Sequence, residues 1–135
     1  MIRRVTVEDI PWLHQLCAEA YRKGHYDPVA SEAWVRSMIP DPNHFVLRGR
    51  GSWMAVTVAG FPWAPKQKWG RFEAVAGKAS KEMFRMAEIS VRWMQEMGAK
   101  GWYMATVNDV DFGPIARYLL GKPATPAYTR EFSIG

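Results

Sequence analysis

The stretch FEAVAGKASKEMFRMAEIS, residues 72–90, decides the fold because a strand runs directly into a helix within it. Residues 71–76 have the short apolar pattern of a buried strand, and residues 83–97 place methionine and alanine at helical spacing. Ser80 is a suitable N-cap for this helix, and Gly98 follows its last apolar residue. The join at GKAS either caps the helix in the ordinary way or also holds a phosphate on unpaired N–H groups.

The remaining elements follow from periodicity and turn signals. Strands are expected at 2–7, 44–49, 52–60, 71–76, 101–107 and 126–134, and helices at 8–22, 31–39, 80–97 and 114–120. Ser31 is expected to cap the second of these helices, and Thr6 with Asp9 resembles a helix-capping pair at the start of the first. The segment FPWAPKQKWG, residues 61–70, holds two prolines and is expected to be a loop. The order β-α-α-β-β-β-α-β-α-β predicts one mixed α/β domain over residues 1–135, with an antiparallel meander followed by a parallel β-α-β crossover.

Composition and charge narrow the functional classes. The 135 residues are 48% hydrophobic and 23% charged, without an apolar run long enough to cross a bilayer and without an apolar leader. Cys17 is the single cysteine, which excludes an internal disulfide and favours a core residue in a cytoplasmic protein. His14, His25 and His44 have no metal-ligand spacing, so no metal site is expected. The net charge of +5 favours anionic partners such as nucleotides, coenzymes, nucleic acid or acidic surfaces.

Four segments stand in an informative order along the chain: IRRVTVEDIPWLHQL (2–16), EMGAKGWYMATVND (96–109), IARYLLGK (115–122) and AYTREF (127–132). Together they resemble the first strand and helix, the third helix with the fifth strand, the fourth helix, and the closing strand of the GCN5-related N-acetyltransferase (GNAT) superfamily. The resemblance covers nearly the whole chain by pattern and order more than by identity. Relative to that pattern, the end of the chain is shortened by about one strand.

The resemblance implies that acetyl-CoA lies between splayed fourth and fifth strands. Its pantetheine would pair with the edge of the fourth strand, at Ala74, Val75 and Ala76. Its pyrophosphate would sit at the start of the third helix, on Gly77, Lys78, Ser80 and Lys81. Asn108 matches a coenzyme-contacting Asn of the family, although the spacing to Tyr118 suits Asp111 as an alternative.

The chain departs from the family in the loop that holds the coenzyme. The family's Q/R-x-x-G-x-G/A motif should fall near residues 79–84, where this chain has ASKEMF and lacks both glycines. Met83 and Phe84 put bulk where the phosphates should approach the backbone closely. Two functions therefore stay open: an acetyl-CoA-dependent N-acetyltransferase acting on an amine, or a degenerate GNAT-fold protein used for binding or assembly. Compactness and divergence would suit a phage or viral origin for the second.

Two residues are candidates for the acid–base chemistry that acetyl transfer needs. Glu73 lies on the expected fourth strand, where some members of the family carry a basic Glu, and its alternative is an ordinary solvent-facing carboxylate. Tyr118 matches the family's proton-donating Tyr by position, and its alternative is a core aromatic residue on a helix face. The acceptor amine, a small molecule or a protein, is not specified by these residues.

The segment 61–70 offers a second kind of surface. Trp63 and Trp69 stand among lysines and either fold back over the sheet or form a surface for a protein partner or a second copy of the chain. Stacking on nucleic acid is the weakest of these alternatives.

Overall fold

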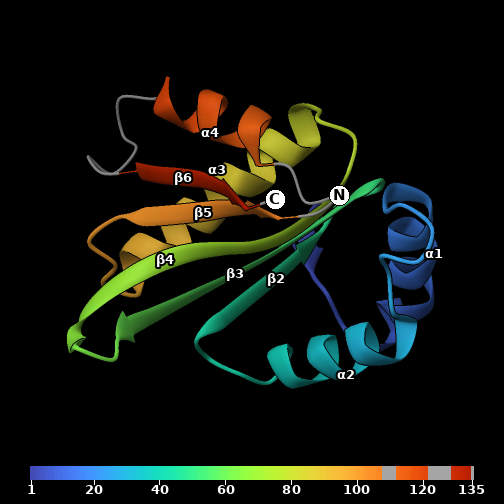
Figure 1. Cartoon of the computed structure of the whole chain (residues 1–135), viewed down its shortest axis with the longest axis horizontal. Coiled ribbons are helices and arrows are strands. Elements are labelled where there is room, and N and C mark those ends of the chain that lie inside the picture. The colour runs from blue at the N-terminus through green and yellow to red at the C-terminus, as the bar shows by residue number, and fades with distance from the viewer. Residues whose placement is uncertain (108–111, 122–128, 135) are drawn as a thin grey trace.

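The computed structural model describes residues 1–107, 112–121 and 129–134, which form one mixed sheet with helices on both faces (Figure 1). Its strands lie side by side in chain order: β1 (Arg3–Arg4), β2 (His44–Arg48), β3 (Ser52–Phe61), β4 (Ala64–Gly77), β5 (Trp102–Val107) and β6 (Thr129–Ile134). Strands β1 to β4 pair antiparallel, whereas β5 pairs parallel with β4 and with β6. The predicted meander followed by a parallel crossover is confirmed.

The helices divide between the two faces of the sheet (Figure 1). They are η1 (Val7–Asp9), α1 (Ile10–Ala20), α2 (Pro28–Met38), α3 (Lys81–Glu96) and α4 (Gly113–Leu120). Leu13 and Val35 pack α1 and α2 on one face, in a core that includes Trp53. Met86 and Leu119 pack α3 and α4 on the other. Among the described residues no helix is both long and apolar enough to cross a membrane.

The strand-to-helix join forms as the sequence predicts. The side chain of Ser80 accepts a hydrogen bond from the Met83 N–H at 3.2 Å, so Ser80 is the N-cap of α3. Met86, Ser90 and Met94 are buried along one side of the helix, as the spacing requires. Gly98 follows the helix at a φ of 86°, which is a conformation that favours glycine.

The prediction of a loop at 61–70 is wrong. Strand β3 continues to Phe61 and β4 begins at Ala64, so the connection is a tight hairpin. Ala59 pairs with Trp69 across the two strands. The prolines mislead because they stand at the turn and at the start of β4, where a missing N–H costs the sheet little.

Three element boundaries also differ from expectation. Helix α2 begins at Pro28, because Asp27 accepts hydrogen bonds from the Val29 and Ala30 N–H groups at 3.0 Å; the predicted cap at Ser31 is wrong. The helix predicted over 8–22 divides into η1 and α1 and ends at Ala20. The first strand spans two residues instead of six.

A buried carboxylate fastens the N-terminal segment to the sheet. Asp9 accepts two hydrogen bonds of 2.7 Å from Arg3, one of 3.1 Å from Arg48 and one of 2.8 Å from the Thr6 N–H. The last of these confirms the predicted pairing of Thr6 with Asp9. The Arg3 hydrogen bonds are the largest of the effects that hold the pKa of Asp9 well below its usual value, so the carboxylate is ionised in the folded protein.

Candidate functional site

Strands β4 and β5 part in the middle of the sheet. Their pairing comprises Gly70 with Trp102, Arg71 with Tyr103 and Phe72 with Met104. Beyond these pairs β4 runs on to Gly77 and β5 runs on to Val107. The strands therefore form a fork, and the edge of β4 that faces β5 is unpaired with it from residue 73 onward.

A hollow of about 240 Å³ lies at this fork. It is lined by the end of β4, the start of α3, the end of α1 and the start of α4: Ala20, Tyr21, Val75, Ala76, Gly77, Ala79, Met83 and Pro114. A second hollow, of about 600 Å³, shares Ala20 and Gly77 with it and continues past the N-terminus of α3. The second hollow is lined by Lys78 and Ser80 but also by Glu19 and Glu82. The two hollows adjoin at Ala20 and Gly77, and we refer to them together as the channel, whose polar end is the lining near the start of α3.

Glu82 reaches from the first turn of α3 to the turn between β2 and β3. Its carboxylate accepts hydrogen bonds from the Arg50 N–H at 2.8 Å, the Gly51 N–H at 3.1 Å and the Ser52 hydroxyl at 2.8 Å. Burial raises the pKa of Glu82, but these hydrogen bonds outweigh burial and lower it. The polar end of the channel therefore holds a fixed negative charge beside its lysine, and the sequence analysis missed this residue.

Gly77 occupies a position that only glycine can fill. Its φ is 112°, and an added Cβ would lie 2.3 Å from the carbonyl oxygen of Gly51. The close packing of the β2–β3 turn therefore accounts for this glycine without any ligand.

Glu73 stands where the fork begins. The partners of Ala55 and Val56 are Ala74 and Phe72, so Glu73 is the extra residue of a β-bulge. Its carboxylate lies 3.3 Å from Nε2 of His44, and its side chain is 16% exposed. Glu73 is therefore neither solvent-facing nor free: it is a largely covered carboxylate that pairs with a histidine.

Tyr118 lies between α4 and α3. Its ring stacks on Phe84 with centroids 4.6 Å apart, and its hydroxyl donates to Glu88. The residues that line the fork hollow do not include it. In this conformation the structure brings Glu73 to the fork but turns the Tyr118 hydroxyl toward α3, and its role as proton donor stays a prediction.

The structure resembles several solved acetyltransferases. An aminoglycoside antibiotic 6'-N-acetyltransferase from Acinetobacter haemolyticus matches with a TM-score of 0.65 at 7% identity, over 95% of this chain and 94% of that one. A predicted acetyltransferase with acetyl-CoA from Clostridium acetobutylicum matches with a TM-score of 0.64 at 12% identity, over 95% and 92%. Glucosamine-6-phosphate N-acetyltransferase from Arabidopsis thaliana matches with a TM-score of 0.60 at 13% identity, over 77% and 80%.

The chain has the GNAT fold. No family model and no curated protein matches the sequence, so the likeness lies in structure and the chain is a divergent example of the fold. The fork between β4 and β5 is the feature that the resemblance in the sequence predicts.

The residues expected to hold coenzyme in this GNAT-fold protein fall into three groups. Val75, Ala76, Gly77, Lys78 and Ser80 line the two hollows. Ala74 is buried against α1 and α2, and Lys81 is exposed outside the residues that line the hollows. Asn108 and its alternative Asp111 lie outside the described residues.

The two bulky residues of the divergent loop lie differently. Met83 is buried and lines the fork hollow, which narrows it. Phe84 turns away to stack on Tyr118. Met83 thus occupies part of the space at the start of α3, and the fork hollow of about 240 Å³ lies beside it.

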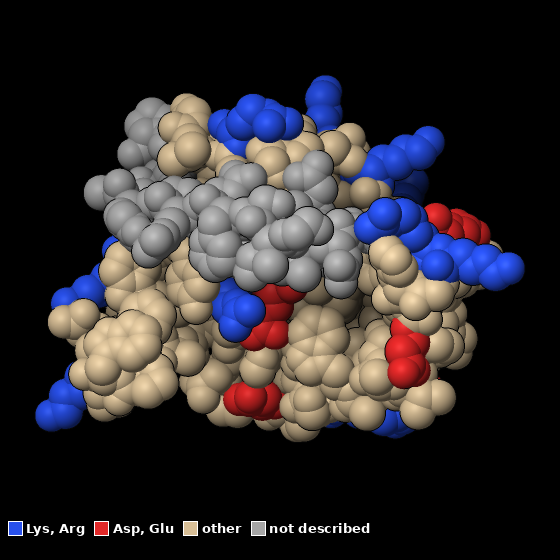
Figure 2. Space-filling view, in the orientation of Figure 1, with Lys and Arg blue, Asp and Glu red and all other residues tan. Residues whose placement is uncertain are grey.

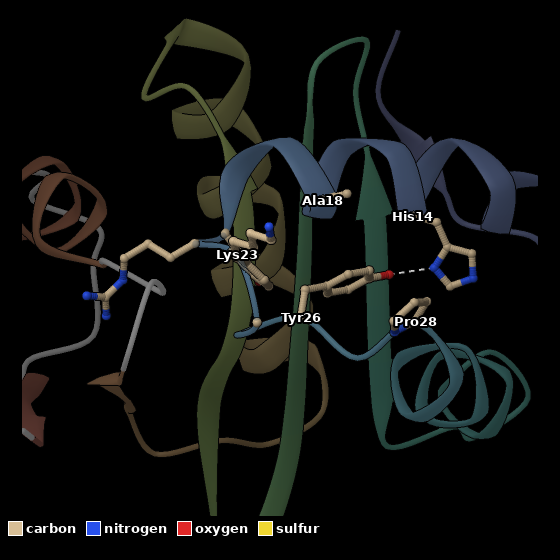
Figure 3. Close-up of a pocket in the computed structure, with 8 residues that line it drawn as sticks. His14, Ala18, Lys23, Tyr26 and Pro28 are labelled. Carbon is tan, nitrogen blue, oxygen red and sulfur yellow. Dashed lines mark hydrogen bonds between the residues drawn. The ribbon is translucent and has the colours of Figure 1, made fainter.

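A third hollow, of about 330 Å³, lies between α1 and the segment before α2 (Figure 3). Its polar wall is His14, whose Nδ1 meets the Tyr26 hydroxyl and whose Nε2 lies 3.3 Å from Glu32. Lys23 lies at another wall, and Tyr21 is shared with the fork hollow.

An aromatic surface lies at the β3–β4 hairpin, the lower left of Figure 2, where large uncharged side chains gather. Phe61 stacks on Trp63 at 4.9 Å and also approaches Trp69 and Tyr103. Trp63 is 79% exposed, whereas Trp69 is half-buried. The side chain of Trp69 is thus partly covered by its neighbours on the sheet, whereas that of Trp63 is open to solvent.

Proposed function

We propose that this protein transfers an acetyl group from acetyl-CoA to an amine. The observation that carries the proposal is the fork: pairing of β4 with β5 stops at Phe72 and Met104 although both strands continue. Beyond Phe72 the edge of β4 is unpaired with β5, and the Val75 carbonyl there accepts a long hydrogen bond of 3.5 Å from the Tyr21 hydroxyl, which an extended ligand could replace. The acetyltransferases among the structural neighbours support the same proposal.

The polar end of the channel fits a phosphate group in part. The first N–H groups of α3, at Lys81 and Glu82, have no intrahelical acceptor, and the helix dipole favours an anion there. Lys78 adds a positive charge at the lining of the same hollow. The carboxylate of Glu82 opposes this attraction, so we expect weaker coenzyme binding than glycine-rich loops give. Bound acetyl-CoA would supply the acetyl thioester.

Glu73 is the proposed base that removes a proton from the acceptor ammonium, because it lies at the first unpaired position of the fork. Tyr118 is the proposed donor of a proton to the departing sulfur. For that role its hydroxyl has to leave Glu88, which a rotation of the tyrosine side chain would accomplish.

Thermal unfolding with acetyl-CoA and with plain CoA tests the proposal. A ligand at a hundredfold excess over its Kd stabilises the folded state by about 2.7 kcal/mol, so both compounds should raise Tm. Charge reversal at Lys78 and Lys81 should reduce this rise. The same reversal at Lys66 and Lys68, both exposed on the hairpin, is the matched control and should leave it unchanged. An unchanged Tm of the wild-type protein at millimolar coenzyme would contradict the proposal.

A specific observation favours a second function, that of a degenerate GNAT-fold binding protein. Glu82 and Met83 place a charge and a bulky side chain where coenzyme phosphates would approach, and Trp63 is exposed beside Phe61. In that case the aromatic surface would hold a protein partner or a second copy of the chain. Trp63→Ala with Trp69→Ala should then weaken association measured by sedimentation without loss of folding. Phage or viral origin and a cytoplasmic location remain expectations from the sequence.

A further inference from the structure

Glu73, His44 and Asp41 form a row of three ionisable side chains that contact one another. Nε2 of His44 lies 3.3 Å from Oε1 of Glu73, and Nδ1 of His44 lies 2.8 Å from Oδ2 of Asp41. The exposed fraction of the side chain rises along this row, from 16% for Glu73 to 20% for His44 and 36% for Asp41. A covered carboxylate at the fork is thus connected through an imidazole to a carboxylate that solvent reaches.

The β-bulge is what aims Glu73 at His44. Phe72 packs with α3 and α4, whereas Ala74, two residues later, packs with α1 and α2. In a regular strand residues two apart share a face, so the bulge puts Glu73 on the same side as Ala74. His44 lies on the same side, because Val46, two residues later in β2, packs in the core that also contains Ala74.

The hydrogen-bond partners of Asp41 fix the proton on one nitrogen of His44. Oδ1 of Asp41 accepts the Asn43 N–H at 2.9 Å, and Oδ2 faces Nδ1 of His44, which must therefore be the donor. Nε2 of a neutral His44 then presents a lone pair to the Glu73 carboxylate, which is unfavourable. A proton placed between Nε2 of His44 and Oε1 of Glu73 would replace this repulsion by a hydrogen bond, so the pair can accept a proton.

We propose that His44 is the positioning and relay residue for Glu73, an inference that rests on the proposed function. An N–H bond of the acceptor ammonium breaks, its electron pair stays on nitrogen, and the proton passes to the Glu73 carboxylate. From there it is shared with Nε2, and the imidazolium is held by Asp41 until a proton leaves to solvent. Arg71, exposed two residues before Glu73 on the same strand, pairs with Thr57 of β3, which in turn pairs with His44 of β2.

Steady-state kinetics of three variants test the relay. His44→Gln should lower kcat about 10-fold to 100-fold with KM for both substrates little changed, as supporting partners of reacting groups typically do. Glu73→Gln should lower kcat at least as much, and the double variant should be no worse than Glu73→Gln alone, because both changes remove one pathway. Glu96→Gln, exposed at the end of α3, is the control and should keep wild-type kcat. Independent, multiplying losses for His44 and Glu73 would overturn the relay.

A measurement without turnover separates this inference from the proposed function. In ¹⁵N-labelled protein the neutral His44 ring should carry its proton on Nδ1, and Glu73→Gln should change the ¹⁵N chemical shift of Nε2, because an amide then replaces the carboxylate that faces this nitrogen. An Nε2 signal that is the same in both proteins would overturn the contact between Glu73 and His44 even if the enzyme is active. A changed Nε2 signal in a protein without acetyl transfer would instead contradict the proposed reaction, and with it the relay's purpose, while the contact would stand.

Discussion

Glu82→Gln should change stability and coenzyme affinity in opposite directions. The carboxylate accepts three hydrogen bonds, from Arg50, Gly51 and Ser52, and glutamine keeps one oxygen, so its amide group must face at least one of these donors. A hydrogen bond to a charged acceptor contributes about 1.5–3 kcal/mol, and partial exposure of Glu82 reduces this to about 1.5 kcal/mol. For a chain of this size that corresponds to a fall in Tm of roughly 6 °C.

The same substitution removes a negative charge from the channel. Two like charges about 4 Å apart in water repel by about 1 kcal/mol, so acetyl-CoA should bind roughly fivefold more tightly. Calorimetric titration and thermal unfolding of the variant give both quantities. Glu19→Gln is the control: Glu19 lines the same hollow and is exposed, so its Tm should stay within about 1 °C of wild type. An unchanged Tm for Glu82→Gln would refute the contribution of the Glu82 hydrogen bonds to stability. Weaker binding of acetyl-CoA by this variant would refute the placement of the coenzyme phosphates beside Glu82.

Three further outcomes follow from described contacts. Gly49→Ala should destabilise because its Cβ would lie 2.1 Å from Cδ of Glu82, whereas Gly51→Ala meets nothing within 4 Å; denaturant midpoints compare the two. Because the pKa of Asp9 is lowered by folding, its contribution is present above its unfolded value near 4 and is lost as pH falls below that; Asp9→Asn should flatten this part of a stability–pH curve. Burial raises the pKa of Cys17 to about 12, so a thiol reagent at neutral pH should label it at the rate of unfolding; fast labelling of folded protein would contradict the burial.

Local signals in the sequence predict much of the fold. Ser80 and the methionine spacing after it define α3, and the order of elements gives the sheet its antiparallel and parallel halves. The prediction of a loop at 61–70 fails although proline lowers strand propensity, because the cross-strand pairing of Trp69 with Ala59 overrides that local preference. Asp27 displaces Ser31 as a cap because Pro28 suits the first turn of the helix.

The site is less predictable because its contacts join distant residues. Glu73 stands out by its place on the fourth strand, but its pairing with His44 depends on a β-bulge that no local sequence pattern predicts. Glu82 has a signal in the sequence, since an acidic residue in the first turn of a helix is common. The sequence around Gly77 favours an external anion at that turn, whereas the protein uses its own carboxylate to bind the β2–β3 turn.

Titration of the ¹⁵N-labelled protein with acetyl-CoA, followed by amide chemical shifts, tests the central claim most directly. The fork and the start of α3 should respond together, with the largest changes in the amides of residues 75–82 and smaller ones near Tyr21. A spectrum that stays unchanged at millimolar acetyl-CoA, or changes confined to the hairpin around Trp63, would contradict a coenzyme site between β4 and β5.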